Sequence, residues 1–523
     1  APSKTPPEYI YIYIYKKRKP SILPPSLSKN HFISPHVHSK SLKKILVPIL
    51  KPKIPFFPPC ILSRNSEKLK LFLQKEEFQW KMGETHLGFP LMLSFVIIFL
   101  GFSPSIHSQS SDASGMQDLK KALNPPSSLG WDDPDPCQWK NVECSKNDNR
   151  VNWIQIGNQG LTGSLPDSLS KLNAPQFLEL QNNHLTGPLP SLNGFGSLQR
   201  ALLGYNNFSY IPPDFFAGMN SLQVVSLDYN QFSSWVIPDS IKSAASLSSF
   251  SATSTNISGS IPDFFGPDAL SSLISLHLSF NNLVGGLPAS FSGSSIQSLW
   301  LNGNKLNGSI DVIGSMTDLT ELWLHENAIT GPLPDFSRLK QLQNVSFRDN
   351  SVTGPVPDSL VALPSLYIVN LTNNKLQGPT PKFAAKSVQL DMNPGSNSFC
   401  SDAPGEPCDP RVNSLLAVAK DMGYPILFAS DWRGNDPCTP VWSGTSCINV
   451  NITVANYPGI MLNGKISPNF SSISSYHKFI FENTTLPVTV PEQLTRSPNL
   501  PHSDLSSHSL PGFEPSFKIN VVA

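Results

Sequence analysis

One stretch, LTELWLHENAITGPLP (residues 319–334), constrains the fold of this chain more than any other. Its leucines alternate on a short predicted strand and point to one side. Asn327 can turn inward and satisfy backbone groups where the chain bends, and Gly331 permits a tight turn. A single unit of this kind cannot bury its own apolar side, so it can fold only when similar units stack beside it.

Similar units recur along the chain at intervals of 23 to 26 residues, counted from the Asn327 position, which we call the ladder position. The ladder positions hold Gln159, Asn183, Asn206, Asn230, Thr255, Asn281, Asn304, Asn327, Asn350 and Asn374. This period is the leucine-rich-repeat signature, and ten unrelated amphipathic strands would not share it. The sequence therefore predicts an α/β solenoid whose first array, of about ten repeats, occupies residues 151–396, with the recognisable repeats ending near Pro381. Asp often follows the closing proline, as at Asp167 and Asp358, where it can cap a short helical turn.

The net charge of +1 hides an uneven distribution. Residues 1–81 are strongly basic, include the run KKRK and show no sustained period. They are predicted to be a disordered basic arm or translated upstream sequence, with the true start at Met82. The remaining chain is net negative, which argues against a nucleic-acid-binding surface.

Residues 82–108 have the pattern of a signal peptide. Positions 87–102 form an uncharged apolar run, and a small polar stretch follows at 103–111. The run is short for a membrane span, so we favour a cleaved signal, with cleavage near Ser108. The alternative is a signal anchor, if residues 1–81 are made.

Six of the seven cysteines fall in close pairs that flank the repeats, and Cys60 stands alone. The pairs are Cys137/Cys144, Cys400/Cys408 and Cys438/Cys447. Local pairs beside a repeat array predict disulfides and an oxidising compartment. Zinc is the alternative for four of these cysteines, but no second cluster with metal-ligand spacing accompanies them.

Two cysteine pairs lie in segments that repeat one motif. WDDPDPCQWKNVEC (131–144) belongs to a predicted N-terminal cap over residues 109–150, preceded by a short amphipathic helix. DWRGNDPCTPVWSGTSC (431–447) repeats its Trp, Asp-Pro-Cys, Trp and Cys within a predicted insert at 397–449. A second cap implies a second array at 450–523, where about three weaker units have ladder positions at Ile460, Thr484 and His508.

These caps, followed by Gly-x-(Ile/Leu)-Pro repeats, resemble the extracellular regions of plant leucine-rich-repeat receptor-like kinases. The order of long array, cysteine-paired insert, second cap and short array resembles the TMK (transmembrane kinase) subfamily over roughly residues 82–523. The resemblance implies a right-handed leucine-rich-repeat superhelix of the plant type, with disulfide-bonded caps, in two arrays separated by a non-repeat insert. Family members continue into a transmembrane helix and a serine/threonine kinase. Neither follows the repeats here, and the kinase motifs are absent from this sequence.

Alternation predicts which side chains face the concave surface: those six, four, two and one residues before each ladder position. We expect Trp300 and Trp323 to lie side by side, about one strand spacing (~4.8 Å) apart. The predicted contact patch comprises Trp300, Trp323, His277, His325, Glu326, Phe280, Tyr229 and Tyr205. Large exposed aromatics on such a face favour a protein or peptide contact. The alternative is that they stack on each other or face the insert.

Eight Asn-x-Ser/Thr sequons predict glycan sites in a secreted protein. They are Asn207, Asn256, Asn307, Asn344, Asn370, Asn451, Asn469 and Asn483. Glycans on Asn344 and Asn370 would cover that end of the concave face and move any contact toward repeats three to eight.

No catalytic constellation, metal cluster or cofactor motif stands out, so an enzyme is not expected. The leading hypothesis is the extracellular binding region of a receptor-like kinase, truncated before its membrane span and located in the secretory pathway and at the plasma membrane. The resemblance implies an extracellular protein or peptide partner, a co-receptor, and auxin perception through apoplastic auxin-binding proteins. The alternative, if the chain is complete, is a secreted inhibitor or decoy in the apoplast. Repeat proteins that inhibit polygalacturonases share the array but lack the insert and second cap.

Overall fold

The structure is a computed structural model that describes residues 112–172, 174–383, 387–457, 466–480, 491–495, 502–504 and 521–522. The predicted basic tract, the signal peptide and Cys60 lie outside these residues. All described residues fall within one compact unit. No helix in the described ranges is long and apolar enough to cross a membrane.

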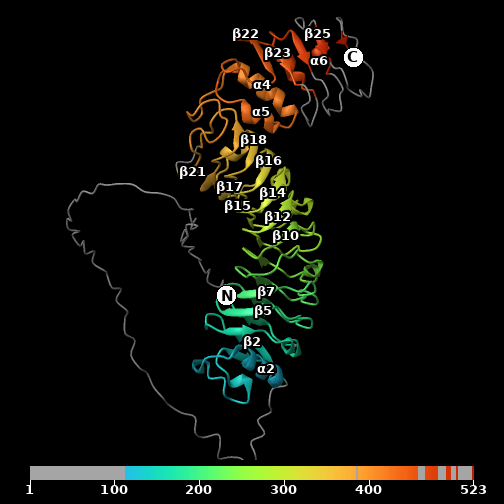
Figure 1. Ribbon diagram of the computed structural model, residues 1–523, viewed down its shortest axis with the longest axis vertical. Coiled ribbons are helices and arrows are strands. Elements are labelled where there is room, and N and C mark those ends of the chain that lie inside the picture. The colour runs from blue at the N-terminus through green and yellow to red at the C-terminus, as the bar shows by residue number, and fades with distance from the viewer. Residues whose placement is uncertain are drawn as a thin grey trace, which may run out of the picture. The chain divides into compact units, whose positions relative to one another are not determined.

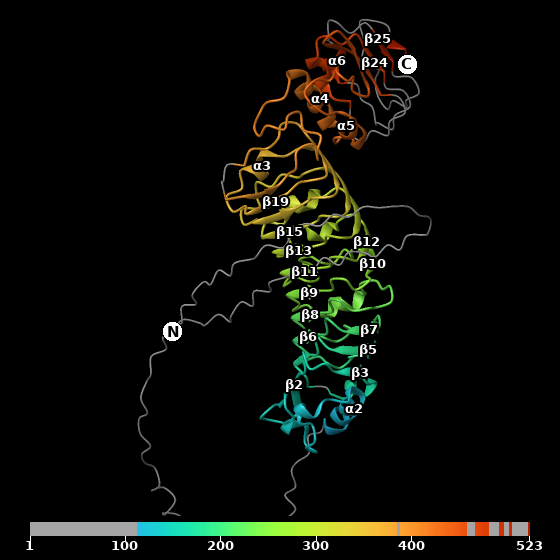
Figure 2. The same ribbon diagram turned by 60° about the vertical axis from the view of Figure 1, so that its left-hand side comes forward.

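A 12-stranded sheet runs through the first array, with its strands stacked in sequence order (Figures 1 and 2). Its first strand, β1 (Val142–Cys144), is antiparallel to β2 (Val151–Gln155), and the remaining strands are parallel. These are β4 (Phe177–Glu179), β6 (Arg200–Leu202), β8 (Val224–Ser226), β9 (Ser249–Ser251), β11 (Ser275–His277), β13 (Ser298–Trp300), β15 (Glu321–Trp323), β17 (Asn344–Ser346), β19 (Ile368–Asn370) and β21 (Gln389–Asp391). Equivalent repeat positions pair from strand to strand, which confirms the predicted solenoid.

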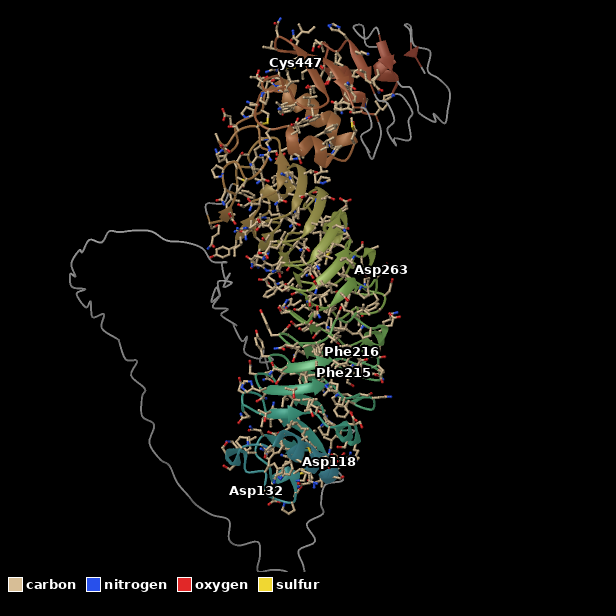
Figure 3. All side chains as sticks on the ribbon, viewed as in Figure 1. Asp118, Asp132, Phe215, Phe216, Asp263 and Cys447 are labelled. Carbon is tan, nitrogen blue, oxygen red and sulfur yellow. A yellow bond between two sulfur atoms is a disulfide. The ribbon has the colours of Figure 1, made fainter. Side chains whose placement is uncertain are left out.

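The central side chain of nearly every strand enters one continuous apolar core. Leu276, Leu299 and Leu322 are fully buried, as the alternating pattern predicts. The core extends from Met116 to Leu376 and includes Phe215, which lies within the array (Figure 3). Burial on this scale explains how short strands with little regular structure of their own hold together.

The ladder asparagines link each repeat to the one before it. Asn327 donates from Nδ2 to the carbonyl oxygens of Leu301 and Leu324, and its Oδ1 accepts from the Leu306 N–H at 3.0 Å. The same arrangement recurs along the array, which confirms the predicted inward turn. Thr255 keeps only part of it, because its hydroxyl donates to the Ala252 carbonyl.

A second set of strands lies beside the first sheet, where the sequence predicted only turns. Three form one sheet, β3 (Thr162–Ser164), β5 (His184–Pro188) and β7 (Asn207–Tyr210); six form another, β10 (Ser258–Ser260), β12 (Asn282–Gly285), β14 (Lys305–Gly308), β16 (Ala328–Pro332), β18 (Ser351–Pro355) and β20 (Lys375–Gln377). The repeat glycine lies on these strands, or directly after β20 in the case of Gly378, at positive φ between 72° and 96°. The two sheets are separate where Tyr210 and Ser234 replace that glycine.

Short helices occupy the opposite side of several repeats. They are η3 (Asp167–Lys171), η4 (Asp239–Ser243), η5 (Ala289–Phe291), η6 (Asp311–Ser315) and α3 (Asp358–Val361). The prediction that Asp caps them is wrong at Asp167 and Asp358, because the preceding proline holds the cap position and makes no side-chain bond. The carboxylate lies in the first turn instead, where its negative charge interacts favourably with the positive end of the helix dipole.

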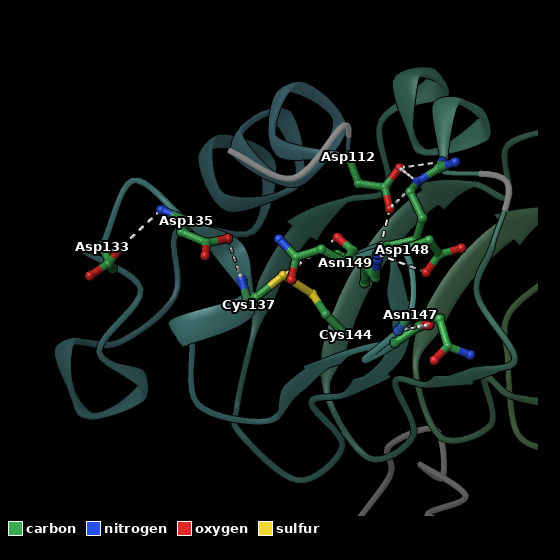
Figure 4. Close-up of a disulfide and its surroundings, with 11 residues drawn as sticks. Asp112, Asp133, Asp135, Cys137, Cys144, Asn147, Asp148 and Asn149 are labelled. Carbon is green, nitrogen blue, oxygen red and sulfur yellow. Dashed lines mark hydrogen bonds and ion pairs between the residues drawn. A yellow bond between two sulfur atoms is a disulfide. The ribbon is translucent and has the colours of Figure 1, made fainter. Parts of the chain in front are cut away.

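The N-terminal cap is built around two stacked indoles, Trp131 and Trp139, whose centroids lie 4.7 Å apart. It contains the predicted helix, α2 (Ala113–Leu123), with η1 (Ser127–Leu129) and η2 (Pro136–Gln138). The Cys137–Cys144 disulfide joins η2 to β1 (Figure 4). The buried Asp112 carboxylate accepts hydrogen bonds from the Arg150 guanidinium and from the backbone N–H of Val151 (Figure 4). This pair ties the start of the cap to the first repeat.

The ladder continues one unit beyond Pro381, where the sequence pattern had stopped. Asn397 donates to the Leu371 carbonyl and accepts from the Leu376 N–H, as the other ladder asparagines do. Beyond it lie the Cys400–Cys408 disulfide, α4 (Pro410–Asp421) and α5 (Ile426–Asp431). The insert packs against the end of the second strand set: α5 contacts β18 and β20, and the Tyr424 ring lies against Gly354.

The second cap repeats the construction of the first. Trp432 stacks on Trp442, and the Cys438–Cys447 disulfide holds β22 (Thr445–Ile448) to the preceding loop. With all three predicted disulfides formed, their sulfurs are not available as thiolate ligands, so the zinc alternative is wrong.

The second array continues the parallel stacking as β23 (Asn451–Asn456), β24 (Lys478–Ile480), β25 (His502–Asp504) and β26 (Val521–Val522), with η7 (Pro468–Ser472) and α6 (Glu492–Thr495). The first three strands cover positions four to six residues before the predicted ladder positions, as in the first array. The predicted ladder residues themselves lie outside the described ranges.

Candidate binding surface

The concave surface is formed by side chains on either side of each buried strand centre. On β15, Leu322 is buried, whereas Glu321 and Trp323 on either side of it are half-buried. The same alternation holds on β11 and β13. The concave positions predicted from the repeat pattern are therefore the accessible ones.

The predicted patch residues His277 and Trp300 stack on neighbouring strands. Their ring centroids lie 4.2 Å apart with the planes 16° from parallel. Trp323 is aligned with Trp300 in the sheet and meets His325 edge-on at 5.8 Å. The two indoles thus lie on adjacent strands as expected, and each has a histidine as its ring partner.

Glu321 organises the polar groups around these rings. It accepts from Trp300 Nε1 at 3.3 Å, Ser298 Oγ at 3.2 Å and Asn344 Nδ2 at 3.0 Å. Because the Ser298 hydroxyl hydrogen is given to Glu321, His277 Nε2 donates to Ser298 Oγ. Glu321 is not among the predicted patch residues, although its place six residues before a ladder position could have indicated it.

Burial keeps both patch histidines neutral. It lowers the pKa of His277 to about 4. It also lowers the pKa of His325, although the nearby Glu326 carboxylate opposes that shift. Neither histidine supplies a positive charge near neutral pH.

The depressed pKa of His277 predicts a loss of stability in acid. Near pH 7 the residue is neutral in both states; as the pH falls from about 6.5 to about 4, the unfolded chain takes up a proton that the folded chain does not. Unfolding free energy should fall by up to about 1.4 kcal/mol per pH unit in this window. Urea unfolding at pH 7 and pH 5 should show a smaller pH dependence for His277→Phe, and an equal dependence would contradict the assignment.

The residue just before the ladder position has left-handed backbone geometry along the whole first array. In most repeats it is Asn, Ser, Asp or Gly, which tolerate positive φ. Tyr205, Tyr229, Phe280 and Glu326 hold the same geometry, with φ between 51° and 57°. Such backbone costs of order 1–3 kcal/mol for a bulky side chain, so these residues weaken the stack.

The three aromatic members of that row are exposed: Tyr205 by 41%, Tyr229 by 40% and Phe280 by 38%. Tyr205 stacks on Tyr229 with centroids 4.7 Å apart. Phe280 lies against Gly303, where an added Cβ would come within 2.5 Å of the ring. The eight predicted patch residues therefore fall into two groups: His277, Trp300, Trp323 and His325 form a half-buried centre, and Tyr205, Tyr229, Phe280 and Glu326 form an exposed row.

The asparagines of the predicted glycosylation sites differ in solvent exposure. Asn256, Asn307, Asn451 and Asn469 are exposed, Asn207, Asn344 and Asn370 are half-buried, and Asn483 lies outside the described residues. Asn307 lies on β14, in the lateral strand set. Asn344 lies on the concave sheet, where its amide nitrogen donates to Glu321.

This difference predicts uneven glycan occupancy. A glycan on Asn344 Nδ2 would have to emerge from a half-buried site and disturb the Glu321 network, whereas one on Asn307 would extend from an exposed strand. Glycopeptide mapping of the chain expressed through the secretory pathway of a plant cell should find Asn307 occupied and Asn344 largely bare. Full occupancy of Asn344 would instead support the expectation that glycans cover the end of the concave surface that carries Asn344 and Asn370.

In the part of the chain that the structure describes, no group of three or more His, Cys, Asp or Glu side chains is placed to hold a metal ion.

Comparison with known proteins places these features among plant receptors. The family model described as "Leucine rich repeat N-terminal domain" matches residues 109–145 and 408–448, and "Leucine Rich Repeat" matches 272–294. Receptor-like kinase TMK2 of Arabidopsis thaliana is 44% identical over 406 residues, 72% of this chain and 43% of the relative. Receptor protein kinase WSS1 of Oryza sativa subsp. japonica is 40% identical over 396 residues, 75% and 43% respectively.

Among solved structures, the leucine-rich-repeat ectodomain of the receptor kinase GASSHO1/SCHENGEN3 from Arabidopsis thaliana is 21% identical, with 75% of this chain and 49% of that chain covered at a TM-score of 0.48. The chain spans about 43% of the length of the two curated relatives. Its two family-model matches to the N-terminal domain fall on the two caps.

Proposed function

Because this chain is a leucine-rich-repeat protein related to the TMK receptor-like kinases of plants, we propose that it is the extracellular ligand-binding region of such a receptor. The ligand is a protein or peptide segment that binds the concave patch. The three cap disulfides support passage through the secretory pathway to the outer side of the plasma membrane. A co-receptor or an auxin-binding protein is the partner that the family association favours.

The exposed row of aromatics is the observation that carries the proposal. Tyr205, Tyr229 and Phe280 occupy backbone positions where small polar residues would be more stable, and they leave about two-fifths of their surface in water. Residues held in a backbone conformation that disfavours their side chains are typical of functional sites. Large aromatic rings that lose little side-chain entropy on binding are also the commonest anchors of protein interfaces.

The half-buried centre supplies fixed polar groups beside these rings. Trp300 is held in place by His277 on one face and by Glu321 at its indole nitrogen. A side chain that is already immobilised loses less entropy on binding. This surface is therefore suited to recognise an extended segment without rearrangement.

The proposal is tested by selecting random twelve-residue peptides on the whole purified chain and measuring their affinities for variants. Tyr229→Asn should weaken binding at least about tenfold without loss of stability, because Asn accepts the left-handed backbone. Trp323→Ala should have a similar effect on affinity. Tyr210→Ala is the matched control, since Tyr210 is 47% exposed but lies at the end of lateral strand β7.

Two results would overturn this function. One is unchanged affinity in both concave variants. The other is an equal loss in Tyr210→Ala, which would place the contact on the lateral side. Urea unfolding of each variant separates a lost contact from a lost fold.

A further inference from the structure

The central part of the concave surface carries only negative charge. In repeats four to eight, the positions six, four, two and one residues before the ladder hold three carboxylates, Asp228, Glu321 and Glu326, and no lysine or arginine. The four strand steps from β8 to β15 span about 19 Å at ~4.8 Å each. The exposed ring of Phe280 and the indole of Trp300 lie on repeats between those of Asp228 and Glu326, and Trp323 lies on the same repeat as Glu326.

Two of these carboxylates, Asp228 and Glu321, are held by neutral donors. Asp228 accepts from the hydroxyls of Ser226 and Ser251 at 2.8 and 2.7 Å and from the Thr253 N–H at 2.7 Å. Glu321 likewise accepts from hydroxyl, indole and amide groups. These bonds fix the carboxylates in place and leave their charge uncompensated.

The arginines that border this region are already engaged. Arg200 pairs with Glu179 at 3.2 Å. Arg348 pairs with Asp349 at 2.9 Å and with Asp391 at 3.2 Å. The flanks therefore carry their own cations, whereas the middle of the face does not.

We propose that the segment bound at this surface is basic, with lysine or arginine side chains that meet Asp228 and Glu326 and lie against the aromatic rings. The inference rests on the proposed function and names the chemical class of its ligand. Carboxylates provide charge complementarity, and aromatic faces attract cations within about 6 Å. An extended chain advances about 3.3 Å per residue, so two basic residues about six positions apart would reach both ends.

The test is the sequence composition of the selected twelve-residue peptides, followed by their affinity for charge variants of the whole chain. Lysine and arginine should be enriched in the selected peptides, with pairs about six residues apart. The double variant Asp228→Asn/Glu326→Gln should bind them about five- to tenfold more weakly in low salt. The wild-type affinity should fall with added salt, and the double variant should depend less on salt.

Asp167→Asn/Asp358→Asn is the matched control, because it removes two exposed carboxylates from the helical side of the repeats. An equal loss of affinity in this control would reduce the effect to net charge and overturn the proposal. Selection of acidic or neutral peptides that still depend on Tyr229 and Trp323 would also overturn it, while leaving the proposed function intact. If the selected peptides ignore both aromatic residues, the proposed function itself fails.

Discussion

Replacing Asn281 with alanine is expected to destabilise the first array by about 3–5 kcal/mol. The Asn281 amide nitrogen donates to the Ala252 and Leu278 carbonyls, and its oxygen accepts from the N–H groups of Thr255 and Ile257 at 3.0 and 2.9 Å. The side chain is buried, so alanine would leave these backbone groups without a partner, at about 1–3 kcal/mol for each buried unsatisfied group. The preceding repeat already has fewer ladder hydrogen bonds, because Thr255 replaces its asparagine, so it cannot make up for the bonds lost at Asn281.

The adjacent residue provides the control for Asn281→Ala. Asn282 is half-buried on the lateral strand β12, where its side chain bonds with Asn256 and Lys305, and Asn282→Ala should cost less than about 1 kcal/mol. Urea unfolding would give the free energies, and amide hydrogen exchange would show whether protection is lost first around β9 and β11. Similar stability of the two variants would mean that the ladder does not carry this share of the fold.

Replacing Gly163 with alanine is expected to separate the N-terminal cap from the first repeat, at a cost of about 2–4 kcal/mol. An added Cβ would lie 2.0 Å from the Ala122 carbonyl oxygen at the end of α2, and a backbone atom cannot give way as a side chain can. Overpacking of this kind costs about 1–3 kcal/mol, and the positive φ of 96° adds strain. The expected result is early loss of protection in α2 and β2.

Gly308→Ala isolates the steric part of that effect. Gly308 holds the same repeat position at φ 78°, but nothing lies within 4 Å of its added Cβ. Gly308→Ala should therefore lower the free energy of unfolding by only about 1 kcal/mol, the cost of placing alanine at a positive φ. Urea unfolding, with amide hydrogen exchange to follow α2 and β2, should distinguish the two variants; equal losses of stability would refute the contact with α2.

The repeat pattern predicted the concave strands and the ladder because both depend on local side-chain chemistry. It did not predict the lateral strands, since a Gly-x-x-Pro segment is compatible with a turn or with an extended strand, and only stacking decides. It also ended one unit early. On β21, Gln389 and Leu390 are exposed, so the buried centre that reveals a strand is missing even though Asn397 keeps its place.

The sequence predicted which residues lie on the candidate surface, but not which side chains contact each other there. Alternation placed His277, Trp300 and Trp323 on the concave side. It could not indicate that Trp300 would take His277 as its ring partner, or that Glu321 would bond to three neighbouring groups. Such bonds join residues 21 to 23 positions apart, and they depend on rotamers that form only when strands are packed.

The row of left-handed residues also makes this scaffold adaptable. Its side chains take no part in the ladder, and φ lies between 51° and 68° at positions 229, 254, 280, 303 and 326, so these positions can be varied while the ladder bonds behind them are kept. A library randomised at these five codons would sample many surfaces on one unchanged frame. Such a chain could acquire new binding specificities by substitution in this row of left-handed residues alone. Asn and Gly would be the most stable residues at these positions.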